Sequence, residues 1–306
     1  MIVITTPTGQ IGRQVLERII DSGKPIRVIA RDPSRLPQRV RESVEVIQGS
    51  HDDIDVVTKA FTGAENVLWL VPPNPQSGNS TEYYLNFTRP ACQAIKRLGV
   101  KRVVGVSSMG RGFGRHAGIL SAAFEMDAFI ESTGVSYRSL RMPYFMENLF
   151  HDLESIKSHG TFYMPMAGDQ KLPLCATRDI ASTAAALLLD ESWSGQDSIP
   201  VVSPDALSPN EMAHVLSEVL ERPIRFQQVS IAEYEATLSQ FGTEAWVKDY
   251  MDMVIAQNEG IYDDDFQKAQ PSDTSFRTWC EEVFQPAILA KTTGRHSFAS
   301  VNKAHP

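Results

Sequence analysis

The chain has 306 residues, of which 42% are hydrophobic and 22% charged, a composition typical of a globular protein. Its formal net charge of -8 argues against a nucleic-acid partner, because phosphate backbones attract clustered Lys and Arg. Three scattered cysteines exclude a disulfide framework or a metal site and favour a reducing, cytoplasmic location. No apolar run reaches the roughly 18 residues of a membrane span, so no membrane partner is expected.

The first sixteen residues have the pattern of a buried strand, a tight loop and the start of a helix. The apolar run 2–4 ends in small, turn-forming residues, and a helical apolar spacing then begins at Ile11 and Val15. Such a loop leaves backbone N–H groups free at the start of the helix, where they and the helix dipole can hold a pyrophosphate. The loop therefore predicts a dinucleotide site, although Thr6 occupies the place of the first glycine in the usual spacing.

Strands and helices alternate through the first half of the chain. Further strands are expected at 26–30, 44–47, 66–71, 101–108 and 135–141, with helices that begin at Pro33, span 54–61 and 81–98, and pass through 124–130. This alternation predicts a parallel sheet with right-handed crossovers, and such sheets bind ligands beyond the carboxyl ends of their strands. Those ends are Thr5–Gly9, Arg31, Val71–Pro73, Ser107–Gly110 and Met142–Phe145.

The second half of the chain has a different pattern of predicted elements. An Ala-rich helix at 179–189 is expected to pack on the sheet, and further elements are a helix capped by Ser208 and Glu211, a strand at 223–229 and a helix from Ser230. We therefore predict an α/β fold, a Rossmann-like doubly wound parallel sheet with a small α+β substrate annex. The predicted core comprises 1–143 and 176–203, the annex comprises 144–175 and 204–290, and 291–306 is a polar tail, expected as a disordered extension.

Five motifs carry a resemblance to a known family. They are Thr-x-x-Thr-Gly-x-x-Gly at 5–12, Val-Ser-Ser at 106–108, Arg-x-Pro-x-Phe-x-Glu-Asn at 141–148, Thr-Arg-Asp-Ile-Ala at 177–181 and Leu-Ser-Glu-Val-Leu-Glu-Arg-Pro-Ile at 216–224. With them the chain resembles, over about residues 1–290, the NmrA-like branch of the atypical short-chain dehydrogenases/reductases. That group includes triphenylmethane reductase and NADPH-dependent quinone reductases.

The resemblance implies NADP(H) as cofactor, with residues 9–12 facing its pyrophosphate. Arg31 ends the second strand 19 residues after Gly12. An NAD site has an acid at that place, whereas an Arg suits a 2′-phosphate, so NADP(H) is preferred over NAD(H). The alternative is a solvated Arg31 before a capped helix. The predicted cofactor contacts are Thr6, Gly9, Gln10, Ile11, Gly12, Arg31, Val71, Pro72 and Ser107.

Two residues depart from the family pattern. Thr6 stands where the family commonly has Gly, and Ser50 stands where many members have an Asp that approaches the adenine. A Thr crowds a loop that needs close backbone approach or unusual dihedrals, although Pro7 and Thr8 can shape a slightly different turn. Loss of cofactor use therefore stays open as an alternative.

The general acid is not evident. Short-chain dehydrogenases use a Tyr followed four residues later by Lys on a helix, and no Tyr here has that partner. Tyr137 and Arg141 have the spacing but lie on a predicted strand. Glu125, which matches a Glu common in the NmrA-like branch, and His116 are the catalytic candidates. A capping or salt-bridging role for Glu125 and a merely solvated His116 are the structural alternatives.

Met142, Tyr144 and Phe145 follow the sixth strand and are predicted to line the substrate side of the nicotinamide. The family's lack of a Tyr–Lys pair fits reduction of a small hydrophobic, conjugated substrate such as a quinone, an enone or a polyketide-like compound. The alternatives are a non-enzymatic NADP(H)-binding redox sensor and a fold that catalyses a non-redox cyclisation or isomerisation. A monomer or homodimer is expected.

Overall fold

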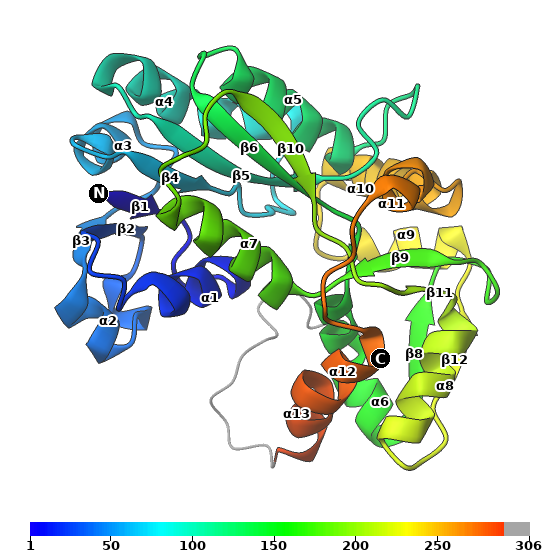
Figure 1. Ribbon diagram of the computed structural model, residues 1–306. Helices are drawn as coiled ribbons and strands as arrows, with labels where there is room; N and C mark the ends of the chain where they lie inside the picture. Colours follow the sequence, from blue (N-terminus) through cyan, green and yellow to red (C-terminus); the bar gives the residue numbers. More distant parts are fainter. Residues whose placement is uncertain (291–306) are drawn as a thin grey trace.

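A seven-stranded parallel sheet forms the centre of the molecule (Figure 1). The computed structural model describes residues 1–290, and the predicted tail at 291–306 lies outside the described residues. The strands are β1 (Ile2–Ile4), β2 (Ile26–Ala30), β3 (Glu45–Gln48), β4 (Asn66–Trp69), β5 (Arg102–Ser108), β6 (Ser136–Met142) and β10 (Gln196–Pro200). Their order is β10-β6-β5-β4-β1-β2-β3, which confirms the predicted Rossmann-like fold.

Helices cover both faces of this sheet, as Figure 1 shows. One face is packed by α1 (Gln10–Ile19), α2 (Gln38–Ser43) and α7 (Thr177–Leu189), and the other by α3 (Ile54–Phe61), α4 (Ser80–Leu98) and α5 (Ile119–Glu131). The central strands β1, β2 and β4 are buried along their whole length and mainly apolar, because helices cover both of their faces. The sequence therefore shows mostly apolar runs here rather than strict alternation.

The helix predicted to begin at Pro33, with Asp32 as its N-cap, is present but short. Asp32 does cap a turn, accepting the Ser34 N–H at 3.0 Å, but the turn is a 3-10 helix over Pro33–Arg35. Leu36 is extended and α2 begins only at Gln38. The cause is Pro37, because a proline disfavours the helical conformation of the residue before it.

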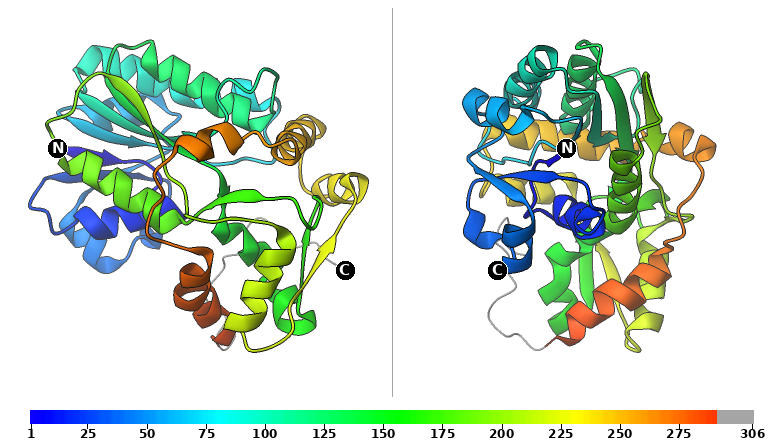
Figure 2. Two further views of the ribbon diagram at one scale, coloured as in Figure 1. Left: turned by 45° about the vertical axis from the view of Figure 1, so that its right-hand side comes forward. Right: turned by 60° about the vertical axis from the view of Figure 1, so that its left-hand side comes forward.

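The remaining chain forms a smaller unit beside the carboxyl ends of the strands (Figure 2). Its strands are β7 (Tyr144–Phe145), β8 (Thr161–Met164), β9 (Leu172–Cys175), β11 (Ala206–Leu207) and β12 (Arg225–Gln228). Its helices are α6 (Leu153–His159), α8 (Pro209–Val219), α9 (Ile231–Leu238), α10 (Glu244–Asn258), α11 (Asp263–Lys268), α12 (Phe276–Trp279) and α13 (Gln285–Leu289), with a 3-10 segment at Met146–Asp152 and a π-helical turn at Cys280–Phe284. We call this unit the annex.

The annex has its own apolar core, to which Phe162, Trp279 and Phe284 contribute fully buried side chains. The predicted capping box of α8 is present, with the Glu211 N–H donating to Ser208 Oγ at 3.3 Å and the Ser208 N–H donating to Glu211 at 2.8 Å. Among the described residues, no helix combines the length and the apolar character needed to cross a bilayer.

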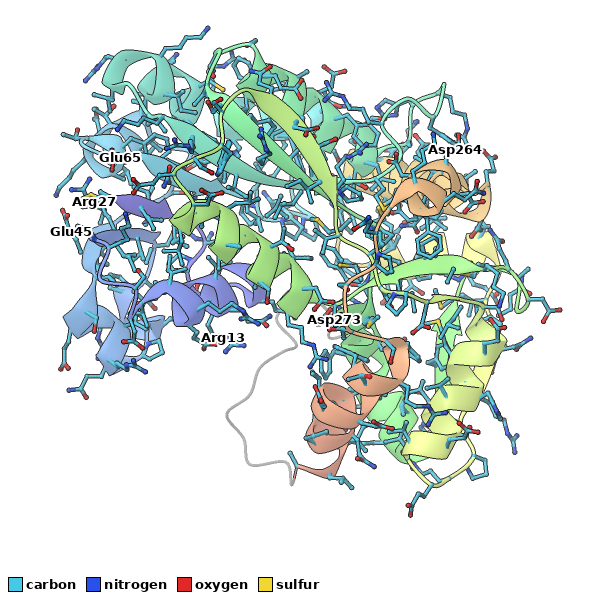
Figure 3. The ribbon with its side chains drawn as sticks, in the orientation of Figure 1. Arg13, Arg27, Glu45, Glu65, Asp264 and Asp273 are labelled. Atoms are coloured by element: carbon cyan, nitrogen blue, oxygen red, sulfur yellow. The ribbon has the colours of Figure 1, made fainter. Side chains whose placement is uncertain are left out.

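Ion pairs at the amino ends of the strands hold the far edge of the sheet (Figure 3). Glu65 pairs with both the N-terminal ammonium and Lys101. Arg27 on β2 pairs with Glu45 on β3 at 2.8 Å and also donates to the carbonyl oxygen of Ala60 at 2.7 Å. These charges lie opposite the edge where a ligand would bind, so they serve the fold.

Candidate functional site

The carboxyl ends of the central strands share one edge of the sheet, beside the annex (Figure 1). Four of the predicted cofactor residues, Thr6, Arg31, Val71 and Ser107, lie at or just after the ends of β1, β2, β4 and β5. The strand order reverses between β1 and β4. Open α/β sheets bind dinucleotides at this reversal, so the sheet brings these residues to one place.

The start of α1 is an open anion cradle. Gly9 is the N-cap, its helix has no side-chain cap and no acid in the first turn, and Gln10 is exposed. Among the described residues, the N–H groups of Gln10, Ile11 and Gly12 have no hydrogen-bond partner. Unpaired N–H groups and the positive end of the dipole favour a phosphate at such a helix start.

Gly12 and Thr6 set the shape of this loop. A Cβ at Gly12 would lie 2.2 Å from the carbonyl oxygen of Thr6, so only glycine permits this approach of helix to strand. Thr6 itself has φ +51°, the left-handed region that β-branched residues rarely enter. Its carbonyl accepts the Gly9 N–H at 3.0 Å. The turn that the family makes with glycine is therefore formed here by threonine, whose Oγ1 is buried with no partner among the described residues.

Arg31 lies exposed at the end of β2. Its guanidinium makes no ion pair or hydrogen bond with another described residue, and its charge acts against the burial that raises the pKa of Tyr83 to about 12. An unengaged guanidinium at this edge is free to contact a phosphate on an adenosine ribose.

The end of β4 is held by side chains from two neighbouring elements. Burial lowers the pKa of His51 to about 4, so its ring is neutral, and its Nε2 lies 2.9 Å from the Leu70 carbonyl oxygen. The Tyr83 hydroxyl donates to the Pro72 carbonyl oxygen at 3.0 Å, and Val71 is buried. Val71 and Pro72 therefore present a fixed backbone at the strand end.

Ser107 is engaged in a buried network. Its hydroxyl donates to Asp127 on α5 at 2.7 Å, as does Ser139, and Tyr137 donates to the same carboxylate at 2.6 Å. A Cβ at Gly105 would lie 1.9 Å from the Tyr137 hydroxyl oxygen, so glycine makes room for the ring. Burial raises the pKa of Asp127 while the three hydroxyls oppose that shift. Sequence reasoning missed Asp127 because the residues of this network are not adjacent in the chain.

Neither predicted catalytic residue lies within a buried site. Glu125 is exposed on α5. His116 is also exposed, and its Nδ1 accepts the Gly118 N–H at 3.2 Å. The His116 ring lies beside Asp249 and Asp252, with ligand atoms within 4.8 Å of one another. Both carboxylates are already engaged, Asp249 by the amide at the start of α4 and Asp252 by a lysine.

The glycine-rich loop after β5 is a packing surface for the annex. A Cβ at Gly110 would lie 2.3 Å from Ile261, and one at Gly118 would lie 1.7 Å from the Asp249 carbonyl oxygen. Asp265 accepts the Gly110 N–H at 2.9 Å and pairs with Arg141 at 3.3 Å. Arg141 therefore forms its ion pair with the annex and does not interact with Tyr137.

The three predicted substrate residues differ in exposure. Met142 is 1% exposed and packs in the core against α1 and α7, so its side chain offers no surface to a ligand. Tyr144 and Phe145 are partly exposed and form the short strand β7, which pairs with β9 of the annex. These two residues bring the chain from the end of β6 into the annex.

Tyr144 belongs to a group that no sequence pattern indicated. Tyr234, Tyr250, Tyr262 and Asp152 interact with its hydroxyl directly or through one another. We call these five residues the tyrosine cluster. Burial raises the pKa of Asp152 to about 7. The five residues come from five segments between 144 and 262, so only folding brings them together.

The Glu of the Arg-x-Pro-x-Phe-x-Glu-Asn motif has a structural role. Glu147 accepts the Thr177 N–H at 3.0 Å, the Thr177 hydroxyl at 2.7 Å and the Trp279 ring N–H at 3.1 Å. It therefore caps α7 from the annex side and ties the two units together.

Comparison with known proteins shows the family of the chain. The NmrA-like family model matches residues 1–290. The chain belongs to the NmrA-like family. A relative from Streptomyces griseus, a (4-alkanoyl-5-oxo-2,5-dihydrofuran-3-yl)methyl phosphate reductase, is 30% identical over 232 residues, which cover 76% of this chain and 78% of the relative. An NAD(P)H azoreductase from Xenophilus azovorans is 25% identical over 256 residues, covering 84% of this chain and 86% of the relative.

Solved structures share the fold of this NmrA-like protein. An NADPH-dependent quinone oxidoreductase from Escherichia coli, complexed with NADPH, has a TM-score of 0.75 and 23% identity, covering 93% of this chain and 100% of the other. Triphenylmethane reductase from Citrobacter sp., complexed with NADP(H), has a TM-score of 0.74 and 21% identity, covering 90% and 97%. Fold and family fit an NAD(P)H-dependent reductase.

The residues of this chain fit the pyrophosphate of such a cofactor. The free N–H groups at the start of α1 supply donors, and the close contact between Gly12 and Thr6 leaves no Cβ in the way. Thr6 holds the left-handed conformation that a glycine enters without strain. When bound there, a nicotinamide cofactor supplies a hydride, while the chain's own residues orient the substrate and move protons.

Proposed function

We propose that this NmrA-like protein is an NAD(P)H-dependent reductase that transfers a hydride to a small hydrophobic, conjugated acceptor, with NADP(H) preferred over NAD(H). The observation that carries the proposal is the open start of α1, with unpaired N–H groups beneath the left-handed turn at Thr6. The reductases among the relatives support it. The three cysteines, buried and unpaired, fit a cytoplasmic location.

Two observations support a conjugated acceptor. Tyr137 is fully buried on Asp127, and no Tyr in the sequence is followed four residues later by a Lys that would help it protonate a simple ketone. The names of three relatives refer to reduction of a 5-oxo-2,5-dihydrofuran, of an azo compound and of a quinone. In each of these, hydride addition places negative charge where conjugation spreads it.

The decisive experiment combines binding with turnover. NADPH at millimolar concentration should raise the melting temperature by mass action, and NADPH absorbance should then fall when quinones, enones and butenolides are added. Gly12→Ala is the control for binding, because its Cβ would collide with the Thr6 carbonyl oxygen. Binding without consumption would favour a redox sensor, and no shift with NADPH would favour a non-redox catalyst. Either result would refute the reductase.

Arg31 tests the cofactor preference. Arg31→Ala should weaken NADPH binding about tenfold or more, because a charge-assisted contact to phosphate contributes about 1.5–3 kcal/mol. NADH, which lacks the 2′-phosphate, should bind the variant and the wild type equally. Arg35→Ala is the matched control, since Arg35 is also exposed but lies in the following 3-10 turn. An equal loss of affinity for NADPH and for NADH would show that Arg31 does not contact the 2′-phosphate.

A further inference from the structure

Helix α10 of the annex packs against two helices of the core, α4 and α5 (Figure 1). Its contact with the glycine-rich loop before α5 is very close, since a Cβ at Gly118 would lie 1.7 Å from the Asp249 carbonyl oxygen. The backbone N–H of Ser80, the first residue of α4, donates to Asp249 Oδ2 at 2.7 Å. Core and annex therefore meet at a point where the backbone and the side chain of Asp249 are both held in place.

Three side chains of metal-ligating types meet at this point. Asp249 and Asp252 are three residues apart on α10, so they lie on the same face of the helix. His116 comes from the glycine-rich loop, where its Nδ1 accepts the Gly118 N–H at 3.2 Å, a long hydrogen bond that a cation at either ring nitrogen would replace. One ligand atom from each of the three side chains lies within 4.8 Å of the other two. Small side-chain rotations would place all three atoms on one cation, whose bonds to such ligands are about 2.0–2.2 Å long.

Both carboxylates keep an oxygen for a cation. Among the described residues, Asp249 uses only Oδ2, which accepts the Ser80 N–H. Asp252 likewise uses only Oδ2, which pairs with Lys248 Nζ at 2.7 Å. The Lys248 side chain is 73% exposed, and exposed ion pairs at this helical spacing contribute little to stability. A divalent cation therefore meets only weak competition from this lysine.

Two buried polar groups at this point lack partners that a cation would supply. Asp249 is 5% exposed and forms no ion pair with a described residue, although a buried carboxylate is costly without a positive partner. Ser80 is 2% exposed, and its hydroxyl, three bonds from the N–H that Asp249 accepts, has no hydrogen-bond partner among the described residues. A hydrated cation at Asp249 would compensate the carboxylate charge and offer a partner to the hydroxyl.

We propose that His116, Asp249 and Asp252 form a binding site for a divalent transition-metal ion, which fastens the loop after β5 to α10. One imidazole nitrogen and two carboxylate oxygens suit Zn²⁺, whereas Mg²⁺ and Ca²⁺ favour oxygen ligands alone. The two carboxylates balance the charge of the ion, and water fills its remaining positions. This site uses none of the cysteines, whose scatter excludes a thiolate site. None of its three ligands lies at the start of α1, so it is independent of the proposed reductase activity.

Calorimetric titration with Zn²⁺ tests the site, on the full chain purified without an affinity tag and treated with EDTA. The ion should bind and should raise the melting temperature by about 4 °C at about one hundred times its Kd. His116→Ala and Asp252→Asn should each weaken binding about tenfold or more, since even residues that only support a ligand contribute that much. His214→Ala is the matched control, because His214 also lies beside a carboxylate, Glu218 at 3.2 Å, but has no third ligand among the described residues.

Lys248→Met gives a measurement in the opposite direction. It removes the ammonium that contacts Asp252, so Zn²⁺ should bind this variant more tightly than the wild type. Mg²⁺ and Ca²⁺ should bind the wild type more weakly than Zn²⁺, because they do not favour the imidazole of His116. The inference is overturned if the wild type binds no Zn²⁺, or if His116→Ala and His214→Ala weaken binding equally. Tighter binding of Ca²⁺ than of Zn²⁺ would also overturn it.

Discussion

Thr6 holds a conformation that a threonine rarely adopts, and its replacement by glycine gives a sharp prediction. The residue has φ +51° at the turn between β1 and α1, and its Oγ1 is buried without a partner among the described residues. Both features cost folding free energy, because an L-residue crowds its own carbonyl in the left-handed region and a buried hydroxyl loses its water. Thr6→Gly removes both costs and leaves the backbone as it is.

The size of the effect follows from opposing contributions. Release from the left-handed conformation is worth about 1–2 kcal/mol, and loss of the unpaired hydroxyl about 1–3 kcal/mol. Glycine opposes them by about 0.5–1 kcal/mol through the greater freedom of its unfolded chain. We therefore expect a net stabilisation of about 2 kcal/mol. With an unfolding entropy of about 2.1 cal/mol/K per residue, the melting temperature should rise by about 3 °C.

Calorimetry or thermal-shift measurement of wild type and variant tests this, with Thr8→Gly as the matched control. Thr8 lies in the same loop with a negative φ, so glycine there should lower the melting temperature. NADPH binding to Thr6→Gly should be at least as tight as to the wild type, because the cradle keeps its geometry. The reasoning is refuted if Thr6→Gly lowers the melting temperature as much as Thr8→Gly does.

Three further substitutions test the architecture around the site. Gly12→Ala should destabilise the protein by at least about 2 kcal/mol although alanine favours helices, because its Cβ would lie 2.2 Å from the Thr6 carbonyl oxygen; a neutral effect on the denaturation midpoint would contradict the close approach. Glu147→Ala should cost about 2 kcal/mol in urea denaturation by uncapping α7, and Glu147→Gln should recover part of it. Asp127→Ala should cost more than about 3 kcal/mol, since it leaves three buried hydroxyls unpaired; a loss below about 1 kcal/mol would mean that water replaces the carboxylate.

The amino-acid sequence by itself determined most of the sheet. Buried parallel strands are mainly apolar and short turns separate them from amphipathic helices, so β1, β2, β4 and β5 could each be located from local pattern. The capping box at Ser208 was equally local, because its partners are three residues apart. Even here, a single residue such as Pro37 moved a helix start.

Only the tertiary structure decided the chemistry available at the strand edge. The left-handed φ of Thr6 follows from the close contact between β1 and α1, and Asp127 gains its three donors from β5 and β6. The tyrosine cluster joins residues up to 118 positions apart, from Tyr144 to Tyr262. Periodicity and propensity describe neighbours along the chain, whereas the pKa of a carboxyl such as Asp152 depends on what folding packs around it.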